Sequence, residues 1–436
     1  MFNHDTVKNT LQSIIQEVAL QRQDYVYNPG KDFTRNRVLT FEKMLSCLIS
    51  MDAGSIHREL LRFFDFSNET PSSSAFVQQR SKIKTSAFET VFQKFTSSFE
   101  TKSYKGYHLL ACDGSIITFP LDDDEKKEEY AYIRKYEGQK DYYQMHLNAL
   151  YDLQSNQYVD AYIEPRKHSN ERKALSIMLE RKHIPAKSII IADRGYESYP
   201  LIAQIQQSGH FYLIRVKNNS DGGMIKSFPL PKEGEYDETL TYTYTYRRGR
   251  DILTQPEKYK VIHYKPSPYF LNSNNPFYEM TIRFVKIKLS NGEYECLITN
   301  LPASDFSALE IGKLYNMRWG IETSFRTLKY TVGLLYFHSK KADFVKQEIW
   351  SRLIMYNVFA IITFNASSGK EKEKKYRYQP NLTDALHICR QFLKNHVAKK
   401  DLDCLILGLL LPIRPDRQAP RKKKNHFSIG FLYRTV

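Results

Sequence analysis

The first hundred residues repeat hydrophobic side chains every three to four positions. LTFEKMLSCLISM (39–51) and GSIHRELLRFF (54–64) both show this period, which is typical of amphipathic helices. In ETPSSSAFVQQRSKIK (69–84) a cluster of serines precedes another helical segment, and serine is a favoured helix N-cap. Because these short helices carry arginine and lysine, they are compatible with helix-turn-helix packing on DNA. The pattern therefore predicts an all-helical N-terminal region.

The hydrophobic pattern changes near residue 107. HLLACDGSIITFP (108–120) is a compact apolar run, and residues 145–166 form two strand patterns joined by a polar turn, which together predict a three-stranded meander. The segments that follow alternate between helix and strand: a capped helix at 168–185, a buried strand at 188–198, a helix at 201–209 and a strand at 210–218. Three antiparallel strands followed by this alternation is the order of the RNase H-like fold, an α/β sandwich.

Strand patterns dominate residues 218–300, where Asn291-Gly292 is a hairpin signal, and we expect a β-rich insertion that interrupts the α/β core. Beyond residue 335 the chain has helical patterns to about 411 and then a proline-broken basic segment, 414–425, which we expect to be mobile. The charged run 122–129 is expected to be a solvated loop rather than a metal site. The predicted domains are 1–100, helical and DNA-binding; 101–217, first part of the RNase H-like catalytic core; 218–300, β-rich insertion; 301–340, second part of the core; and 341–436, helical with a basic tail.

Composition adds a partner class to this architecture. The 436 residues include 64 Lys and Arg against 48 Asp and Glu, a net charge of +16, which favours a polyanion such as nucleic acid. No apolar run is long enough for a membrane span, and the N-terminus has no signal-peptide pattern. The five cysteines are scattered without a CxxC pair, which argues against a disulfide framework or a zinc site. We therefore expect a cytoplasmic protein without membrane contact.

The stretch YNMRWGIETSFRTLKYTVG (315–333) carries reactive side chains at helical spacing. On a regular helix, Tyr315, Arg318, Glu322 and Lys329 fall on one stripe of about a sixth of the circumference, beside an apolar flank. A solvated helix face has the same residue types, so the stripe by itself does not establish a site.

Two aspartates extend this candidate site. Asp113 ends the apolar strand LLACD and Asp193 ends IIIAD, so both are expected at the carboxyl edge of the sheet, although an aspartate there also serves as a turn or cap residue. Together with Glu322 they form three converging carboxylates, which require a cation and select Mg²⁺ or Mn²⁺. Two such ions support in-line phosphoryl displacement. Arg318 and Lys329 would then grip phosphates, and Tyr315 would bond a phosphate or stack on a sugar or base.

At this point a resemblance becomes specific. CDGS (112–115), ADRGYES (192–198) and the pattern Y-x2-R-x3-E-x6-K (315–329) resemble the blocks of the insertion-sequence-four family of DDE transposases, over about residues 107–340. The resemblance implies Asp113, Asp193 and Glu322 as catalytic metal ligands, and Tyr315, Arg318 and Lys329 as contacts to the transposon end.

The resemblance also implies cut-and-paste movement of DNA by a dimer that holds both terminal inverted repeats. Some members pass through a DNA hairpin and hold a flipped base on an aromatic side chain, which the sequence does not locate. Trp319 lies near Tyr315 on the helix and either touches DNA or packs, with packing favoured; Trp350 lies further along the chain. Arg194 and Tyr196, beside Asp193, either contact DNA or only shape the turn at Gly195, and His146 and His168 are expected to be structural.

These observations predict a transposase that cleaves at its element ends and joins the 3′-hydroxyls to target DNA, using two Mg²⁺ ions (or Mn²⁺) per site. Its expected partners are double-stranded DNA and a second copy of the chain, in the bacterial cytoplasm and associated with the nucleoid. Two alternatives stay open: an RNase H-like nuclease without strand transfer, and a catalytically silent DNA-binding protein derived from a transposase.

Overall fold

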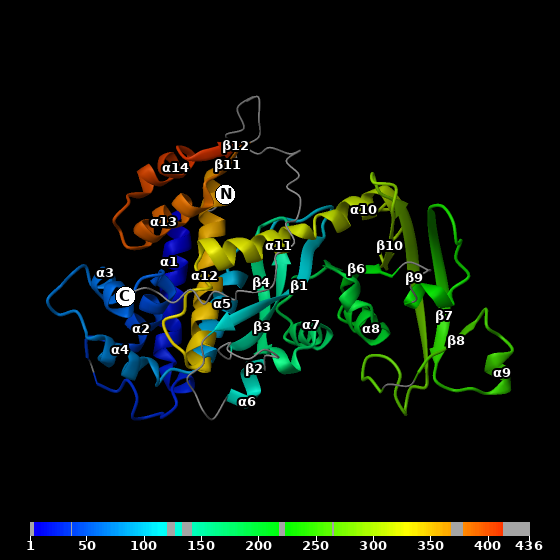
Figure 1. Cartoon of the computed structure of the whole chain (residues 1–436), viewed down its shortest axis with the longest axis horizontal. Helices are drawn as coiled ribbons and strands as arrows, with labels where there is room; N and C mark the ends of the chain where they lie inside the picture. Colours follow the sequence, from blue (N-terminus) through cyan, green and yellow to red (C-terminus); the bar gives the residue numbers. More distant parts are fainter. Residues whose placement is uncertain are drawn as a thin grey trace, which may run out of the picture.

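The computed structural model describes residues 4–35, 37–119, 127–132, 142–217, 223–263, 266–367 and 378–412. Within these residues ten strands form one mixed sheet. Nine of them follow the order β2-β3-β1-β5-β6-β10-β9-β7-β8, and the tenth, β4, pairs with β3 on the side away from β1. Figure 1 shows this sheet along the long axis of the molecule, with the N-terminal helices at one end and strands β7 to β9 at the other. The basic segment 414–425 and residues 122–126 lie outside the described residues.

The N-terminal region is helical, as the hydrophobic period predicted. Its helices are α1 (His4–Leu20), a 3-10 turn η1 (Arg22–Tyr25), α2 (Phe41–Ser50), α3 (Ile56–Phe63), α4 (Ser73–Arg80) and α5 (Ser86–Ser97). Thr40, Ser55 and Ser72 cap α2, α3 and α4 by accepting a hydrogen bond from a backbone amide in the first turn. The serine cluster predicted as a cap therefore marks the true start of α4 at Ser72.

The predicted three-stranded meander is confirmed as β1 (His108–Phe119), β3 (Tyr142–Asp152) and β4 (Gln157–Pro165), which pair antiparallel. A short helix α6 (Lys127–Tyr130) and strand β2 (Ala131–Tyr132) lie between β1 and β3, so the end of the charged run 122–129 is helical rather than a loop.

The alternating elements that follow are η3 (Arg166–His168), α7 (Glu171–Glu180), β5 (Ser188–Ala192), η4 (Arg194–Tyr196), α8 (Tyr199–Gln207) and β6 (Phe211–Val216). Strand β5 pairs parallel with both β1 and β6. The strand order β4-β3-β1-β5-β6 is thus a mixed α/β arrangement with the connectivity that the sequence predicted.

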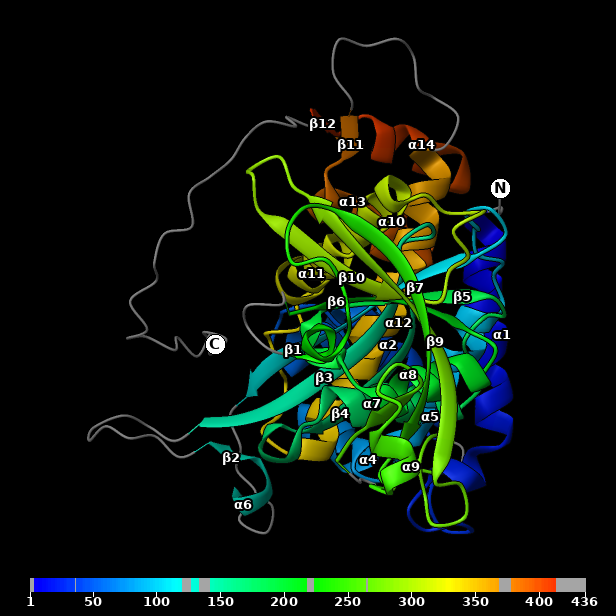
Figure 2. The same cartoon turned by 90° about the vertical axis from the view of Figure 1, so that its right-hand side faces the viewer.

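The β-rich segment continues this sheet instead of standing apart from it. Its elements are η6 (Met224–Ser227), β7 (Tyr236–Thr245), α9 (Arg250–Leu253), β8 (Tyr259–Val261), β9 (Phe277–Lys288) and β10 (Tyr294–Thr299). β10 pairs antiparallel with β6 and with β9, and the turn between β9 and β10 contains Gly292 at a φ of 86°, as the Asn-Gly signal predicted. Figure 2 shows the strong twist of the sheet, with β7 and β9 turned steeply away from β1 and β3.

The C-terminal elements are α10 (Ala308–Asn316), α11 (Trp319–Arg326), a π-helical turn η7 (Thr327–Thr331), α12 (Ala342–Ser367), β11 (Tyr378–Pro380), α13 (Leu382–Leu393), α14 (Lys399–Leu407) and β12 (Leu410–Pro412). Because β11 and β12 pair, the predicted all-helical tail is wrong at these two strands. The long helix α12 packs on α1, α2 and α5 on one side and on β4 on the other, and it joins the N-terminal helices to the sheet (Figure 1).

Side chains on β1 alternate between the two faces of the sheet and so define its two sides. Leu110 and Cys112 pack with the side chains of α7 and α8, whereas Leu109 and Ala111 face the side covered by α10, α11 and α12. By the same alternation, the Asp113 side chain lies on the face of the sheet that is covered by α10 and α11.

Candidate active site

Asp113 and Asp193 lie side by side at one edge of the parallel part of the sheet. The β1–β5 pairing ends at Cys112 opposite Ala192, so each aspartate is the first residue beyond the last pair. The prediction that Asp113 ends its strand is wrong, because β1 continues to Phe119 through its pairing with β3. The functional consequence is unchanged, since both carboxylates still occupy the carboxyl edge of the parallel pair.

Each aspartate is held by a nearby glycine amide. The amide of Gly114 donates to Asp113 Oδ1 at 2.8 Å, and the amide of Gly195 donates to Asp193 Oδ1 at 2.7 Å. Each of these bonds uses one oxygen, Oδ1, of the carboxylate. These bonds orient the two carboxylates relative to the rigid strands.

Glu322 reaches the same edge from helix α11, and Arg318 connects it to Asp113. Arg318 Nη2 donates to Glu322 Oε1 at 3.0 Å, while Arg318 Nη1 lies 3.6 Å from Asp113 Oδ2. The guanidinium is only 7% exposed, so it faces the carboxylates rather than solvent. The predicted proximity of Arg318 and Glu322 is therefore present, with a third partner that the helix stripe did not show.

The predicted single helix from residue 315 to 333 is interrupted twice. A turn at residues 317 and 318 separates α10 from α11, and η7 adds a π-helical turn after Arg326. Tyr315 still lies beside Arg318, whose guanidinium carbon is 5.9 Å from the tyrosine ring centroid. Tyr315 is only 3% exposed and packs in a core cluster with Leu109 and Leu314. The expected DNA contact by Tyr315 is therefore corrected to a core position.

Lys329 lies in the π-helical turn and returns to β1. Its Nζ donates to the carbonyl oxygen of Ile116 at 2.9 Å, three residues beyond Asp113. Burial lowers the pKa of the Lys329 ammonium from its usual value. The Lys329 ammonium thus lies against the strand that carries Asp113. In the sequence, only the spacing between Lys329 and Glu322 pointed to this position.

Two side chains shortly after Asp193, those of Arg194 and Tyr196, have opposite environments. Arg194 is exposed, whereas Tyr196 has no exposed surface and belongs to the core cluster that contains Cys112. The expectation that Tyr196 contacts DNA is therefore corrected, because its ring fills the interior beneath the turn. Arg194 keeps a free approach to solvent.

The two tryptophans also differ. Trp350 is buried on α12 and packs against Phe92, with ring centroids 5.2 Å apart. Trp319, for which packing was favoured, is 49% exposed on the first turn of α11, and the Arg318 guanidinium lies 5.1 Å from its ring centroid. Trp319 is therefore only partly packed, and about half of its surface is open to solvent.

Burial and neighbouring charges shift the protonation of Asp113. Burial raises the pKa of Asp113 to about 6; the Gly114 amide and Arg318 oppose this rise, and the negative charges of Asp193 and Glu322 add to it. Both neighbouring carboxylates are therefore close enough to disfavour the charged form of Asp113. Arg318 alone neutralises only part of this cluster.

The donor set fits a hard divalent cation, which prefers carboxylate oxygens. In the described part of the chain no three His, Cys, Asp or Glu side chains are already gathered tightly enough to hold a metal ion, and Arg318 bridges two of the three carboxylates. Asp113, Asp193 and Glu322 thus supply oxygen donors of the kind such a cation prefers, and the Arg318 guanidinium lies between two of them.

The sequence interpretation missed one carboxylate at this edge. Glu171, the first residue of α7, has its pKa raised by burial and by the charges of Asp113 and Asp193. His146, expected to be structural, lies beside it, with Nε2 at 3.6 Å from Glu171 Oε1. No sequence signal distinguishes Glu171, because a glutamate after an Asn cap is an ordinary helix start.

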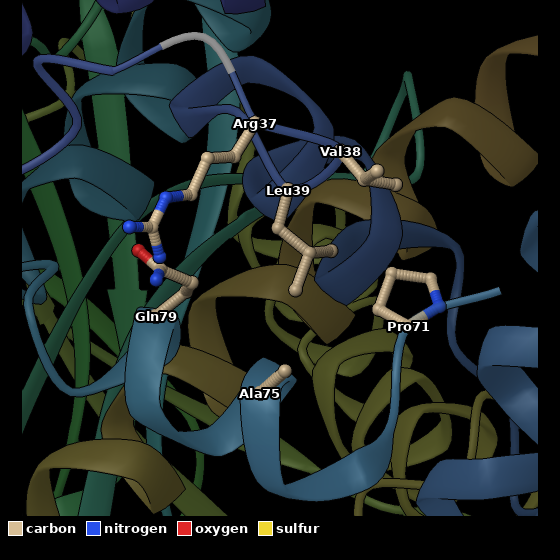
Figure 3. A pocket seen from close by; sticks show the side chains of 6 residues that line it. All are labelled: Arg37, Val38, Leu39, Pro71, Ala75 and Gln79. Atoms are coloured by element: carbon tan, nitrogen blue, oxygen red, sulfur yellow. The ribbon is translucent and has the colours of Figure 1, made fainter. Parts of the chain in front are cut away.

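A separate pocket of about 440 Å³ lies among the N-terminal helices. Figure 3 shows its lining: Arg37, Val38, Leu39, Pro71, Ala75 and Gln79. None of these residues belongs to the carboxylate site, and the mostly apolar lining offers neither a nucleophile nor a metal ligand.

The described helices include none with the length and apolar character needed to cross a bilayer.

Comparison with known proteins gives a consistent result. Residues 104–358 match the family described as Transposase DDE domain. The chain is 23% identical over 416 residues to the transposase InsG for insertion sequence element IS4 of Escherichia coli (strain K12), covering 89% of this chain and 86% of that protein. It is 22% identical over 311 residues to the transposase for insertion sequence element IS231D of Bacillus thuringiensis subsp. finitimus, covering 65% and 64% of the two chains.

Among solved structures, a piggyBac transposase synaptic complex with hairpin DNA aligns with a TM-score of 0.45 at 10% identity, over 97% of this chain and 88% of that one. The family match spans more than half of the chain and includes all three carboxylates at the sheet edge. The chain therefore belongs to the insertion-sequence-four family of DDE transposases.

Proposed function

We propose that this transposase binds the terminal inverted repeats of its element, cleaves the DNA at both ends and joins the freed 3′-hydroxyls to target DNA. The observation that supports the proposal is that Asp113 and Asp193 follow the last residue pair of two adjacent parallel strands, while Arg318 contacts both Asp113 and Glu322. The net charge of +16 supports a polyanionic substrate.

The three carboxylates would hold two Mg²⁺ ions, or Mn²⁺ in their place. When bound, these ions supply activation of a water or 3′-hydroxyl and stabilisation of the leaving oxygen in an in-line displacement. The chain's own contribution is positional: Asp113 and Asp193 are oriented by glycine amides on rigid strands, and Glu322 by a helix packed on the same sheet.

Arg318, Lys329 and Arg194 are the proposed phosphate contacts. Arg194 is exposed, and the Lys329 side chain bonds the strand that carries Asp113, so both can meet DNA lying along this edge. Arg318 contacts Asp113 and Glu322 and offsets part of their negative charge, and its guanidinium would be available for a phosphate if it left them. Tyr315 and Tyr196 are buried and are not proposed as contacts.

We further propose that a homodimer synapses the two ends, since excision requires both ends to be cut together. A cytoplasmic, nucleoid-associated location stays a prediction from the sequence.

The decisive experiment incubates purified wild-type protein and the Glu322→Gln variant with labelled DNA that carries the gene's own flanks, plus supercoiled target, in Mg²⁺ or EDTA. Glutamine keeps the shape of the side chain and its bond with Arg318 but removes the charge. Mg²⁺-dependent excision and joining by the wild type only is the expected result.

Two other outcomes correspond to the alternative functions. Cleavage without joining would favour a nuclease, and end binding by both proteins without cleavage by either would favour a silent DNA-binding relative. Either outcome would overturn the strand-transfer proposal.

A further inference from the structure

A fourth carboxylate, Glu171, approaches the catalytic edge from the opposite face of the sheet. It begins α7, whose buried side chains pack with Leu110 and Cys112, whereas Glu322 comes from the face covered by α11. Its side chain is 36% exposed, so it opens to the same solvent-accessible edge and is not a core residue.

Glycines at two positions leave room for the Glu171 carboxylate. A Cβ added to Gly114, the residue after Asp113, would lie 2.8 Å from Glu171 Oε1. A Cβ added to Gly195 would lie 3.2 Å from Glu171 Oε2 and 2.9 Å from Asp193 Oδ1. The His146 ring would lie even closer to a Cβ on Gly114, so the imidazole and the Glu171 carboxylate together fill the space between the segments that carry the two catalytic aspartates.

These distances also limit the separation of Glu171 from Asp193. Because both oxygens lie close to the same point on Gly195, they are no further apart than the sum of the two distances. Carboxylates at that spacing can share a site with two cations about 3.5–4 Å apart, either directly or through the waters that Mg²⁺ retains.

The first turn of α7 is anchored at this place. Asn170 caps the helix by accepting from the amide of Lys173, and its own amide donates to Glu164 Oε1 at 3.1 Å. Arg172 Nε donates to the carbonyl oxygen of Gly195 at 2.7 Å and ties the helix to the turn after Asp193. Glu171 is therefore held by its neighbours on both sides, as a metal ligand must be.

A purely structural role would leave Glu171 as a partner of His146 or as a favourable charge at a helix start. The Nε2–Oε1 separation of 3.6 Å is longer than a hydrogen bond, so His146 does not account for its position. A helix-start charge needs no particular direction, yet the carboxylate points between Gly114 and Gly195.

We propose that Glu171 is a fourth carboxylate of the metal site, placed opposite Glu322 and acting with Asp113 and Asp193. This inference rests on the proposed metal-dependent function. It assigns α7, and not only the strands and α11, to the catalytic centre.

The test measures Mn²⁺ binding to the full chain by the electron paramagnetic resonance signal of free Mn²⁺, without DNA or turnover. The test variant is Glu171→Gln. Asp113→Asn removes a ligand of the proposed triad and serves as the positive control, and Glu180→Gln makes the same change at the far end of α7 as the negative control. We expect Glu171→Gln to weaken binding about tenfold or more, as Asp113→Asn does, with Glu180→Gln unchanged.

Wild-type binding together with equal binding by Glu171→Gln would overturn the role of Glu171 and leave the proposed function standing. Absence of saturable binding by the wild type would overturn both. Melting curves in EDTA identify a variant that does not fold. If Glu171→Gln fails there, Glu171→Asp carries the test: the shorter side chain keeps the charge, and undiminished Mn²⁺ affinity would contradict the proposal.

Discussion

Arg318 lies between two proposed metal ligands and forms its shorter contact, 3.0 Å, with Glu322 one helical turn further on. Its other terminal nitrogen faces Asp113 at 3.6 Å. An arginine in this position serves as the counter-charge of the site while no cation is bound, since carboxylates at a partly buried edge repel one another.

Replacing Arg318 with alanine tests this counter-charge. In EDTA we expect the free energy of unfolding to fall by about 1–3 kcal/mol, because Asp113 and Glu322 lose their common partner. Added Mg²⁺ should then raise the melting temperature of the variant by more than it raises that of the wild type. Arg326→Ala, at an exposed position of the same helix, is the control. Equal losses in the two variants would contradict the role of Arg318.

Asp113→Asn should abolish cleavage yet stabilise the metal-free protein. The pKa of Asp113 is raised to about 6 in the folded chain, from an ordinary value of 3.8, so the folded state binds the proton more tightly than the unfolded state. Protonation of Asp113 therefore stabilises the folded state. This stabilisation is complete below pH 3.8 and is lost as the pH rises through about 6. In EDTA at pH 7 we expect the variant to be about 1–3 kcal/mol more stable, with a weaker dependence of melting temperature on pH between 4 and 7. A wild-type melting curve that matches the variant throughout this range would disprove the prediction.

The contrast between the two tryptophans can be measured directly. Trp350→Ala should cost about 3–5 kcal/mol of stability, because the ring is buried against Phe92. Trp319→Ala should leave the melting temperature nearly unchanged, since half of the side chain is already in water. We expect it instead to weaken binding of the element ends by about 1–3 kcal/mol, the range of base stacking on an aromatic side chain. Unchanged affinity in a gel-shift titration would exclude stacking by Trp319.

A buried ion pair joins the N-terminal helices to α12 and should control acid stability. Arg80 Nη1 lies 3.0 Å from Glu348 Oε1, and His338 Nδ1 lies 3.0 Å from the other oxygen. Burial alone would raise the pKa of the Glu348 carboxyl, but the charges of His338 and Arg80 outweigh burial and hold that pKa well below its usual 4.5. The stabilising contribution is therefore present above pH 4.5 and is lost as the pH falls.

Arg80→Ala should cost about 3–5 kcal/mol at neutral pH, because it leaves a buried carboxylate short of a partner. The loss should shrink in acid as Glu348 becomes protonated. Denaturant titrations at neutral and acidic pH would show this difference, and a loss that does not depend on pH would contradict the ion-pair account. Arg62→Ala, on the exposed side of α3, is the matched control.

The sequence by itself indicated the helical N-terminal region, the order of strands and helices along the chain up to β6, and the three candidate carboxylates. Serine and threonine caps, apolar runs and the spacing of Asp113, Asp193 and Glu322 are local signals, and a local signal survives folding when no distant contact opposes it. The family resemblance rested on the same blocks.

Only the tertiary structure decided which side chains share the site. Periodicity identifies an apolar face but not the element that will cover it, so Tyr315 and Tyr196 could not be recognised as core residues. Glu171 is separated from Asp113 by the whole meander, and its approach depends on how α7 packs beneath β1 and β5. The pairing of β10 with β6, which merges the β-rich segment with the central sheet, likewise depends on backbone groups far apart in the chain.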